Sequence, residues 1–269
     1  GKQALNSERA RWLALARETP KLFAEAKNEM RIFSAAGRTE LAGNHTDHNH
    51  GRVIAASIQL DALAFVAPRK DNSVLFRSAG YPDVHIDIGD TAVLEAERGK
   101  TEALVRGIAG CFKEKGLATG GWVANVHNKV LAGSGLSSSA AIEVLVASIF
   151  NSLYNDNALG PLDLAKMGQR AENHWFGKPC GLMDQIACAS GGAVAINFEN
   201  PEKPELEKLP FNPQDAGLCL CVLNTGGSHA DLTADYAAIP QEMKALAQSL
   251  GAAVLRETSK EAVLAQAAE

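Results

Sequence analysis

Residues 131–142 read Leu-Ala-Gly-Ser-Gly-Leu-Ser-Ser-Ser-Ala-Ala-Ile and separate two segments of different periodicity. Before this stretch, residues 121–130 alternate as a strand does. After it, apolar residues recur every three or four positions as far as Leu153, which indicates a helix with one buried face. The stretch is therefore a glycine- and serine-rich loop that runs from a strand into the N-terminus of a helix.

This loop has the chemistry of a phosphate site. Gly133 and Gly135 let the backbone turn tightly and approach a ligand. Ser137, Ser138 and Ser139 fall where the helix begins, among N–H groups without helical partners and at the positive end of the helix dipole, which suits phosphate. The plain alternative is a serine-capped helix after a glycine turn. Three successive serines between glycines and alanines favour phosphate.

Two better-known nucleotide motifs fit the loop poorly. A Walker loop requires a lysine directly after its second glycine, and this loop has none. Ser138 stands where a dinucleotide-binding fingerprint has its third glycine. A Rossmann dehydrogenase with Asp156 as its ribose contact therefore remains only an alternative.

Composition limits the class of protein. The 269 residues are 46% apolar and 21% charged, which is typical of one or two globular domains. A net charge of −5 without a basic patch argues against nucleic-acid binding. No apolar run is long enough to span a membrane, and the N-terminus lacks a leader, so we expect no membrane association. Five cysteines without a Cys-x-x-Cys pair predict reduced thiols in a cytoplasmic protein.

A polar run at residues 37–51 holds three histidines, two acids, two asparagines and one arginine between two apolar strands, 32–36 and 53–58. A charged cluster held between core strands is more often a site than a solvated surface. One hypothesis is a metal site formed by His45, Asp47, His48 and His50. In an extended chain, however, alternate residues face opposite ways, so these ligands would need a special turn to converge. The other hypothesis is a sugar site, because hydroxyl groups pair with carboxylates, imidazoles and amides.

Two acids further along have ordinary interpretations when each is taken alone. Glu172 lies beside the apolar face of a helix predicted over residues 160–176, and no lysine or arginine lies three or four residues away to pair with it. Asp184 follows a loop shaped by one proline and two glycines. The first would be a solvated acid and the second a helix cap.

Together, the motifs resemble those of the galactokinases, a branch of the GHMP small-molecule kinases. The loop has their Gly-Leu-Ser-Ser-Ser-Ala-Ala sequence. The polar run matches their signature at Gly37, Arg38, Gly43, His45, Thr46, Asp47, Asn49 and Gly51, and departs from it at Glu40, Asn44 and His48. Residues 180–185 match Cys-Gly-x-Met-Asp-Gln at every fixed position. Further matches are Ala171-Glu172-Asn173-His174, and Asn224, Thr225, His229 and Tyr236 in a later sugar motif.

The resemblance implies an α+β GHMP kinase fold. Residues 1–200 would form the N-terminal domain, a mixed sheet with helices like domain 2 of ribosomal protein S5. Residues 201–269 would begin a ferredoxin-like C-terminal domain. The glycine-rich third motif of the family is absent, so we expect a part of a whole kinase.

The implied activity is ATP-dependent phosphorylation of galactose at its anomeric hydroxyl. Asp184 would be the catalytic base, and Arg38 would keep it ionised or stabilise the transferring phosphoryl group. The implied sugar contacts are Asn44, His45, Thr46, Asp47, Gly181 and Tyr236. The implied ATP contacts are Gly133, Ser134, Gly135, Leu136, Ser137, Ser138 and Ser139. Mg²⁺ would be held by Ser139 and Glu172.

Galactose and MgATP are thus the expected partners of a monomer. The alternatives are N-acetylgalactosamine or another hexose as substrate, and a sensor that binds sugar and nucleotide without catalysis. An amide at Asn44, where the family has Glu, leaves the sugar less certain than the reaction.

Several further elements are predicted. Residues 101–114 should form a helix, because Leu104, Ile108 and Phe112 share one face. We expect an N-terminal helix over residues 5–30 that breaks near Pro20. Residues 63–68 and 73–78 are predicted to form a hairpin. Residues 199–215 are predicted to be a connection between domains, and residues 218–223, which include Cys219 and Cys221, a buried strand.

Overall fold

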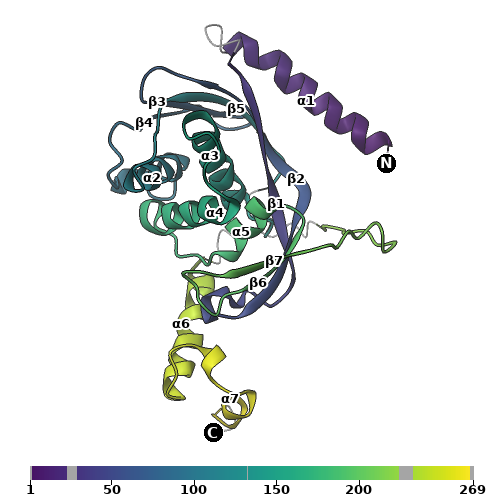
Figure 1. Ribbon diagram of the computed structural model, residues 1–269, viewed down its shortest axis with the longest axis vertical. Helices are drawn as coiled ribbons and strands as arrows, with labels where there is room; N and C mark the ends of the chain where they lie inside the picture. The colour runs from purple at the N-terminus through teal and green to yellow at the C-terminus, as the bar shows by residue number, and fades with distance from the viewer. Residues whose placement is uncertain (1, 23–28, 132, 224–232, 267–269) are drawn as a thin grey trace.

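The computed structural model describes residues 2–22, 29–131, 133–223 and 233–266 (Figure 1). In this part of the chain, seven strands form one mixed sheet in the order β4-β3-β5-β2-β6-β7, with β1 paired to β2. The strands are β1 (Arg31–Ala42), β2 (Arg52–Pro68), β3 (Ser73–Ser78), β4 (Val84–Asp87), β5 (Trp122–Asn128), β6 (Ala193–Asn197) and β7 (Glu205–Leu209).

Strand β2 is the centre of the sheet. It runs unbroken for 17 residues, whereas the sequence predicted separate strands at 53–58 and 63–68. Its first residues pair with β6, its last residues pair with β5, and β1 pairs with residues 54–66. The pairing with β1 shifts register between Ala36 and Arg38, and a bulge of this kind re-aims a side chain.

Four helices cover one face of the sheet: α2 (Thr101–Glu114), α3 (Ser138–Tyr154), α4 (Pro161–Arg170) and α5 (Met183–Ser190) (Figure 1). The main core lies between these helices and the sheet. Phe150 of α3 is central to it, with ring centroids 5.8 Å from Trp122 and 5.6 Å from Phe112. Ala140 and Ala141, in the first turn of α3, belong to this core. Helix α5 packs through Met183 and Ile186 in a second cluster, with residues of β2 and β6.

Helix α1 (Lys2–Leu22) lies on the other face of the sheet, where Leu15 packs against Leu63 and Phe65 (Figure 1). Arg11 of this helix forms an ion pair with Asp61 of β2. The helix includes Pro20 and ends two residues later, at Leu22, near the predicted break. Residues 23–28 of the predicted segment lie outside the described residues.

The predicted hairpin of residues 63–68 and 73–78 is also wrong. Strand β5 lies between these segments, antiparallel to β2 and parallel to β3. Gly121 lets β5 enter, because its N–H donates to the carbonyl of Asp71 at 2.7 Å and a β-carbon there would lie 2.4 Å from the carbonyl of Ser73. The local sequence of two adjacent strands does not reveal a third that inserts between them.

Two predictions for the C-terminal region are corrected. Residues 205–209 form β7, which pairs antiparallel with β6, so residues 199–215 are more than a connection. Residues 218–223 form no strand and are exposed: Leu223 keeps 86% of its surface, and Cys219 and Cys221 are exposed as well. Within the described residues no strand pairs with this apolar run, and a strand needs a partner edge.

Helices α6 (Thr233–Ser249) and α7 (Lys260–Gln266) follow (Figure 1). Met243 of α6 contacts the polar run, with its sulfur 3.4 Å from Nε2 of His48 and 3.2 Å from Nδ2 of Asn49. Arg256 donates to the carbonyl of His50 at 2.6 Å. The division into domains 1–200 and 201–269 stays a prediction.

Candidate active site

Arg38 of β1 connects three segments that are far apart in the sequence. Its Nε and Nη2 donate to the two carboxylate oxygens of Asp184, each at 2.7 Å. Its Nη1 donates to the carbonyl of Gly135, also at 2.7 Å. Only 8% of the arginine side chain is exposed. A planar guanidinium in this two-pronged geometry fixes both the position and the charge of the acid.

Asp184 lies in the first turn of α5 and accepts a third hydrogen bond from the hydroxyl of Ser137. Burial raises the pKa of Asp184, but the charge and hydrogen bonds of Arg38, with the hydroxyl of Ser137, outweigh burial and hold that pKa below its ordinary value. The side chain keeps 31% of its surface exposed. Asp184 is therefore an ionised carboxylate that a small molecule can still reach.

The serine loop ends in an uncapped helix. Gly133, Gly135 and Ser137 have φ angles of 71°, 73° and 60°, which lie in the left-handed region. Ser137 precedes the first residue of α3, but its side chain caps no N–H group and donates to Asp184 instead. The alternative of an ordinary serine-capped helix is therefore not what the structure contains. The first N–H groups of α3 have no side-chain cap and can bind an anion.

A glycine on β1 brings the serine loop close to Arg38. The backbone N–H of Arg38 donates to the carbonyl of Leu136 at 3.1 Å. A β-carbon on Gly37 would lie 2.8 Å from that carbonyl oxygen, so a larger residue would push the loop away. The close approach of β1 to the loop thus depends on Gly37.

Glu172 faces the start of α3 from a π-helical segment, η3 (Ala171–Phe176), rather than from the regular helix predicted over 160–176. It is 2% exposed. The hydroxyl of Ser139 donates to its Oε1 at 3.2 Å, so the two predicted metal ligands lie together. These are two oxygen donors, the type that Mg²⁺ prefers.

Lys178 is a site residue that the sequence analysis missed. Its Nζ lies 3.2 Å from Oε1 of Glu172, so this acid is not unpaired. The lysine is six residues further along, outside the helical spacing that was considered. Gly177, at φ 85°, turns the chain back, and the N–H groups of both Gly177 and Lys178 donate to the carbonyl of Glu172.

A second buried carboxyl group was missed as well. Gln185 and Glu143 are fully buried, and Nε2 of Gln185 donates to Oε2 of Glu143 at 3.0 Å and to Oε2 of Glu172 at 3.1 Å. Burial, with the neighbouring charge of Glu172, raises the pKa of Glu143 well above its ordinary value. Glu143 therefore takes up a proton more readily than an ordinary glutamate does. The signal was present, because Glu143 is the one charged residue in the sequence of α3.

The polar run forms a compact turn. Residues Thr46–Asn49 make a 3₁₀ helix, η1, flanked by His45 and His50 at φ 52° and 59°. The carboxylate of Glu40 accepts the N–H of His45 at 2.9 Å, which holds the start of the turn. Within the described residues no three His, Cys, Asp or Glu side chains gather as a metal site would require.

The predicted sugar residues divide by exposure. Asn44 and His45 are exposed, whereas Asp47 is 9% exposed. Asp47 accepts the N–H of Met183 at 3.1 Å, and a β-carbon on Gly181 would lie 1.7 Å from its Oδ2. Thr46 donates to the carbonyl of Gly43 at 2.9 Å. The turn is thereby joined to the segment that begins α5.

The later sugar motif is described only in part. Tyr236 lies on α6, but its side chain is outside the described part of the chain, as are Asn224, Thr225 and His229.

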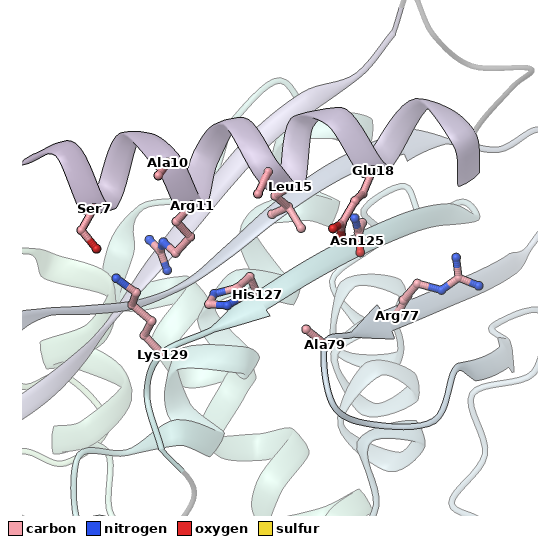
Figure 2. A pocket seen from close by; sticks show the side chains of 11 residues that line it. Ser7, Ala10, Arg11, Leu15, Glu18, Arg77, Ala79, Asn125, His127 and Lys129 are labelled. Carbon is pink, nitrogen blue, oxygen red and sulfur yellow. The ribbon is translucent and has the colours of Figure 1, made fainter.

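A cavity of about 730 Å³ lies away from these residues, between α1 and the outer face of β3 and β5 (Figure 2). Its lining includes Arg11, Leu15 and His127, and none of the predicted site residues. The size of a cavity therefore does not mark the candidate site. Among the described helices, none is long and apolar enough to cross a membrane.

Two family models match parts of this chain. The model for the N-terminal domain of GHMP kinases matches residues 103–192, and the galactokinase galactose-binding signature matches residues 21–68. The galactokinase of Clostridium tetani is 36% identical over 178 residues, which are 66% of this chain and 44% of that protein. The galactokinase of Lacticaseibacillus casei is 34% identical over 201 residues, which are 74% and 51%. The chain spans about half the length of the curated relatives it matches.

Solved structures confirm the predicted α+β fold. Lactococcus lactis galactokinase complexed with galactose superimposes with a TM-score of 0.75 at 25% identity, covering 93% of this chain and 65% of that one. The mevalonate kinase of Methanococcus jannaschii, at 16% identity and a TM-score of 0.60 over 87% of this chain and 75% of its own, shares the fold.

Proposed function

Since the chain belongs to the GHMP kinase family, we propose that it carries the sugar and nucleotide site of a galactokinase, which transfers a phosphoryl group from ATP to the anomeric hydroxyl of galactose. One observation carries this proposal. The Arg38–Asp184 ion pair lies directly beside the uncapped start of α3, so a base and an anion site are adjacent.

The nucleotide phosphates bind at residues 133–139 and the first N–H groups of α3. Phosphoryl transfer depends mostly on alignment and charge neutralisation, and both are available at a helix N-terminus. Ser139 and Glu172 are the residues that would hold Mg²⁺, which supplies neutralising charge to the phosphates when bound. Their two oxygens, 3.2 Å apart, suit such an ion.

Asp184 accepts the proton of the anomeric hydroxyl, a general-base role that contributes typically about 10²–10⁴-fold. Arg38 keeps this base ionised. All three guanidinium nitrogens already have acceptors, which supports tuning of Asp184 over direct contact with the phosphoryl group. The positive charge still favours the developing negative charge nearby.

The exposed side chains of Asn44 and His45 bind sugar hydroxyls. Thr46, Asp47 and Gly181 shape the turn that presents them, because the contacts of Asp47 within the protein leave little of its surface free. A contact from Tyr236 remains part of the proposal, from the motif alone.

The test is ADP release by the full-length protein with MgATP and galactose, N-acetylgalactosamine or glucose, with the product position read by ³¹P NMR. We expect release with galactose and a fall of about 10²–10⁴-fold in kcat for Asp184→Asn. Asp163→Asn, which changes an aspartate in the first turn of the preceding helix, α4, is the control and should not alter kcat.

Near-normal turnover by Asp184→Asn would remove this residue as the base. Galactose binding without ADP release would identify a sensor, and turnover with a different hexose would correct the substrate.

A further inference from the structure

We propose that Lys178 is a tethered counter-cation for the metal site: its ammonium group occupies the metal-binding oxygen of Glu172 in the absence of a divalent cation and competes with that cation. The inference rests on the proposed function, since it takes Glu172 as the metal ligand. Lys178 lies between the motifs at residues 171–174 and 180–185 and belongs to neither.

The two oxygens of Glu172 have different partners. Oε2 accepts a hydrogen bond from Gln185 at 3.1 Å. Oε1 lies 3.2 Å from the hydroxyl of Ser139 and 3.2 Å from Nζ of Lys178. The oxygen that faces the second metal ligand is thus the one that the lysine contacts. A metal ion shared by Ser139 and Glu172 would therefore bind the same oxygen as the ammonium of Lys178.

Burial explains why Glu172 needs a cation. Its side chain is 3% exposed, and an ionised carboxylate at that depth is strongly disfavoured without an opposite charge. The neighbouring Glu143 is fully buried and brings no positive charge. Among the described residues, Lys178 forms an ion pair with Glu172, so in the absence of a metal its ammonium group supplies the opposite charge.

The two partners differ in freedom of movement. The side chain of Lys178 keeps 49% of its surface exposed, so its ammonium can move into water when a metal arrives. Glu172 is held by Gln185 and by the backbone of η3. The backbone N–H of Lys178 donates to the carbonyl of Glu172 at 3.1 Å, which keeps the lysine within reach. When a metal ion binds, we therefore expect the side chain of Lys178 to move and Glu172 to keep its position.

A competing cation weakens the binding of metal alone. The experiment is a titration of the full-length protein with Mn²⁺, without nucleotide, in which free Mn²⁺ is measured by electron paramagnetic resonance. We expect Lys178→Gln to bind Mn²⁺ about tenfold more tightly than the unchanged protein, a difference of about 1.4 kcal/mol. Lys178→Arg, which keeps the charge, should stay close to the unchanged protein.

Two controls separate this proposal from the proposed function. Lys115→Gln removes a lysine of similar exposure, 51%, which pairs with Asp163 3.9 Å away, and should not change the affinity. Glu172→Gln should abolish the site. If Glu172→Gln binds Mn²⁺ normally, the metal site of the proposed function is wrong. If it loses Mn²⁺ while Lys178→Gln shows no gain, only the counter-cation is refuted.

A second measurement uses the unchanged protein, so it does not depend on whether a variant folds. Acetic anhydride should acetylate Lys178 slowly in the metal-free protein and several-fold faster with saturating Mn²⁺, read by mass spectrometry, while Lys115 keeps one rate. An unchanged rate at Lys178 despite bound Mn²⁺ would overturn the proposal.

Discussion

Replacing Arg38 by methionine tests the centre of the site. The change keeps an unbranched side chain of similar length but removes the guanidinium and its three hydrogen bonds to Asp184 and Gly135. Asp184 then retains the hydroxyl of Ser137 as its remaining partner among the contacts described above. The site becomes a partly buried carboxylate without a cation.

The magnitude follows from burial. Removing one partner of a fully buried ion pair costs about 3–5 kcal/mol. Arg38 is 8% exposed but Asp184 is 31% exposed, and water screens part of the loss. We therefore expect Arg38→Met to lower the free energy of unfolding by about 2–4 kcal/mol at pH 8.

The loss should depend on pH. In the unchanged protein the pKa of Asp184 is lowered, so its ionised form stabilises the fold above the ordinary aspartate pKa, and this contribution disappears as pH falls through the lowered value. Without Arg38, burial raises that pKa, and the native carboxylate takes up a proton sooner. The cost of Arg38→Met should therefore shrink between about pH 8 and pH 5.

The assay is urea unfolding followed by tryptophan fluorescence at both pH values, with the double variant Arg38→Met, Asp184→Asn beside the single ones. The double variant has no carboxylate left without a cation, so it should regain about 1–2 kcal/mol relative to Arg38→Met. An equal cost at both pH values, or no recovery in the double variant, would show that charge burial is not the cause.

Two other variants probe contacts beyond this pair. Gly181→Ala should lower the free energy of unfolding by about 3 kcal/mol or more, because the added carbon would lie 1.7 Å from Oδ2 of Asp47. It should also weaken galactose binding measured by calorimetry. The control Gly160→Ala adds its carbon in open space and should change stability by no more than about 0.5 kcal/mol, so equal melting temperatures for the two variants would contradict this prediction. The pKa of Glu143 is raised in the native state, so the native protein holds this proton more tightly than the unfolded chain, which loses it above about pH 5. The stability of Glu143→Gln relative to the unchanged protein, measured in thermal melts, should therefore grow from pH 5 to pH 8. A difference that stays constant with pH would show that the pKa of Glu143 is not raised.

The residues that the sequence predicted best are those with fixed spacing within a motif. In the structure Arg38 contacts Asp184, and Ser139 contacts Glu172, so residues named together from the motifs lie together. Their roles stay predictions. Thr101–Glu114 was predicted as a helix at its observed bounds, because its apolar face repeats with helical period.

The sequence failed where a partner comes from elsewhere in the chain. Lys178 reaches Glu172 through a turn at Gly177, which helical spacing does not consider. Strand β5 lies between β2 and β3, and this long-range pairing cannot be predicted from the local sequences of β2 and β3. Residues 218–223 are apolar enough for a strand, but composition does not supply the edge on which a strand must pair.

The length of β2 has a mechanical consequence. Its beginning follows the turn with the proposed sugar residues, and its end pairs with β5, which leads into the serine loop. The turn with the proposed sugar residues and the serine loop are thus both connected to one continuous strand. We expect the backbone amides of β2 to resist deuterium exchange together along its whole length. We therefore expect the sheet, and not a ligand, to set the distance between the proposed sugar residues and the serine loop.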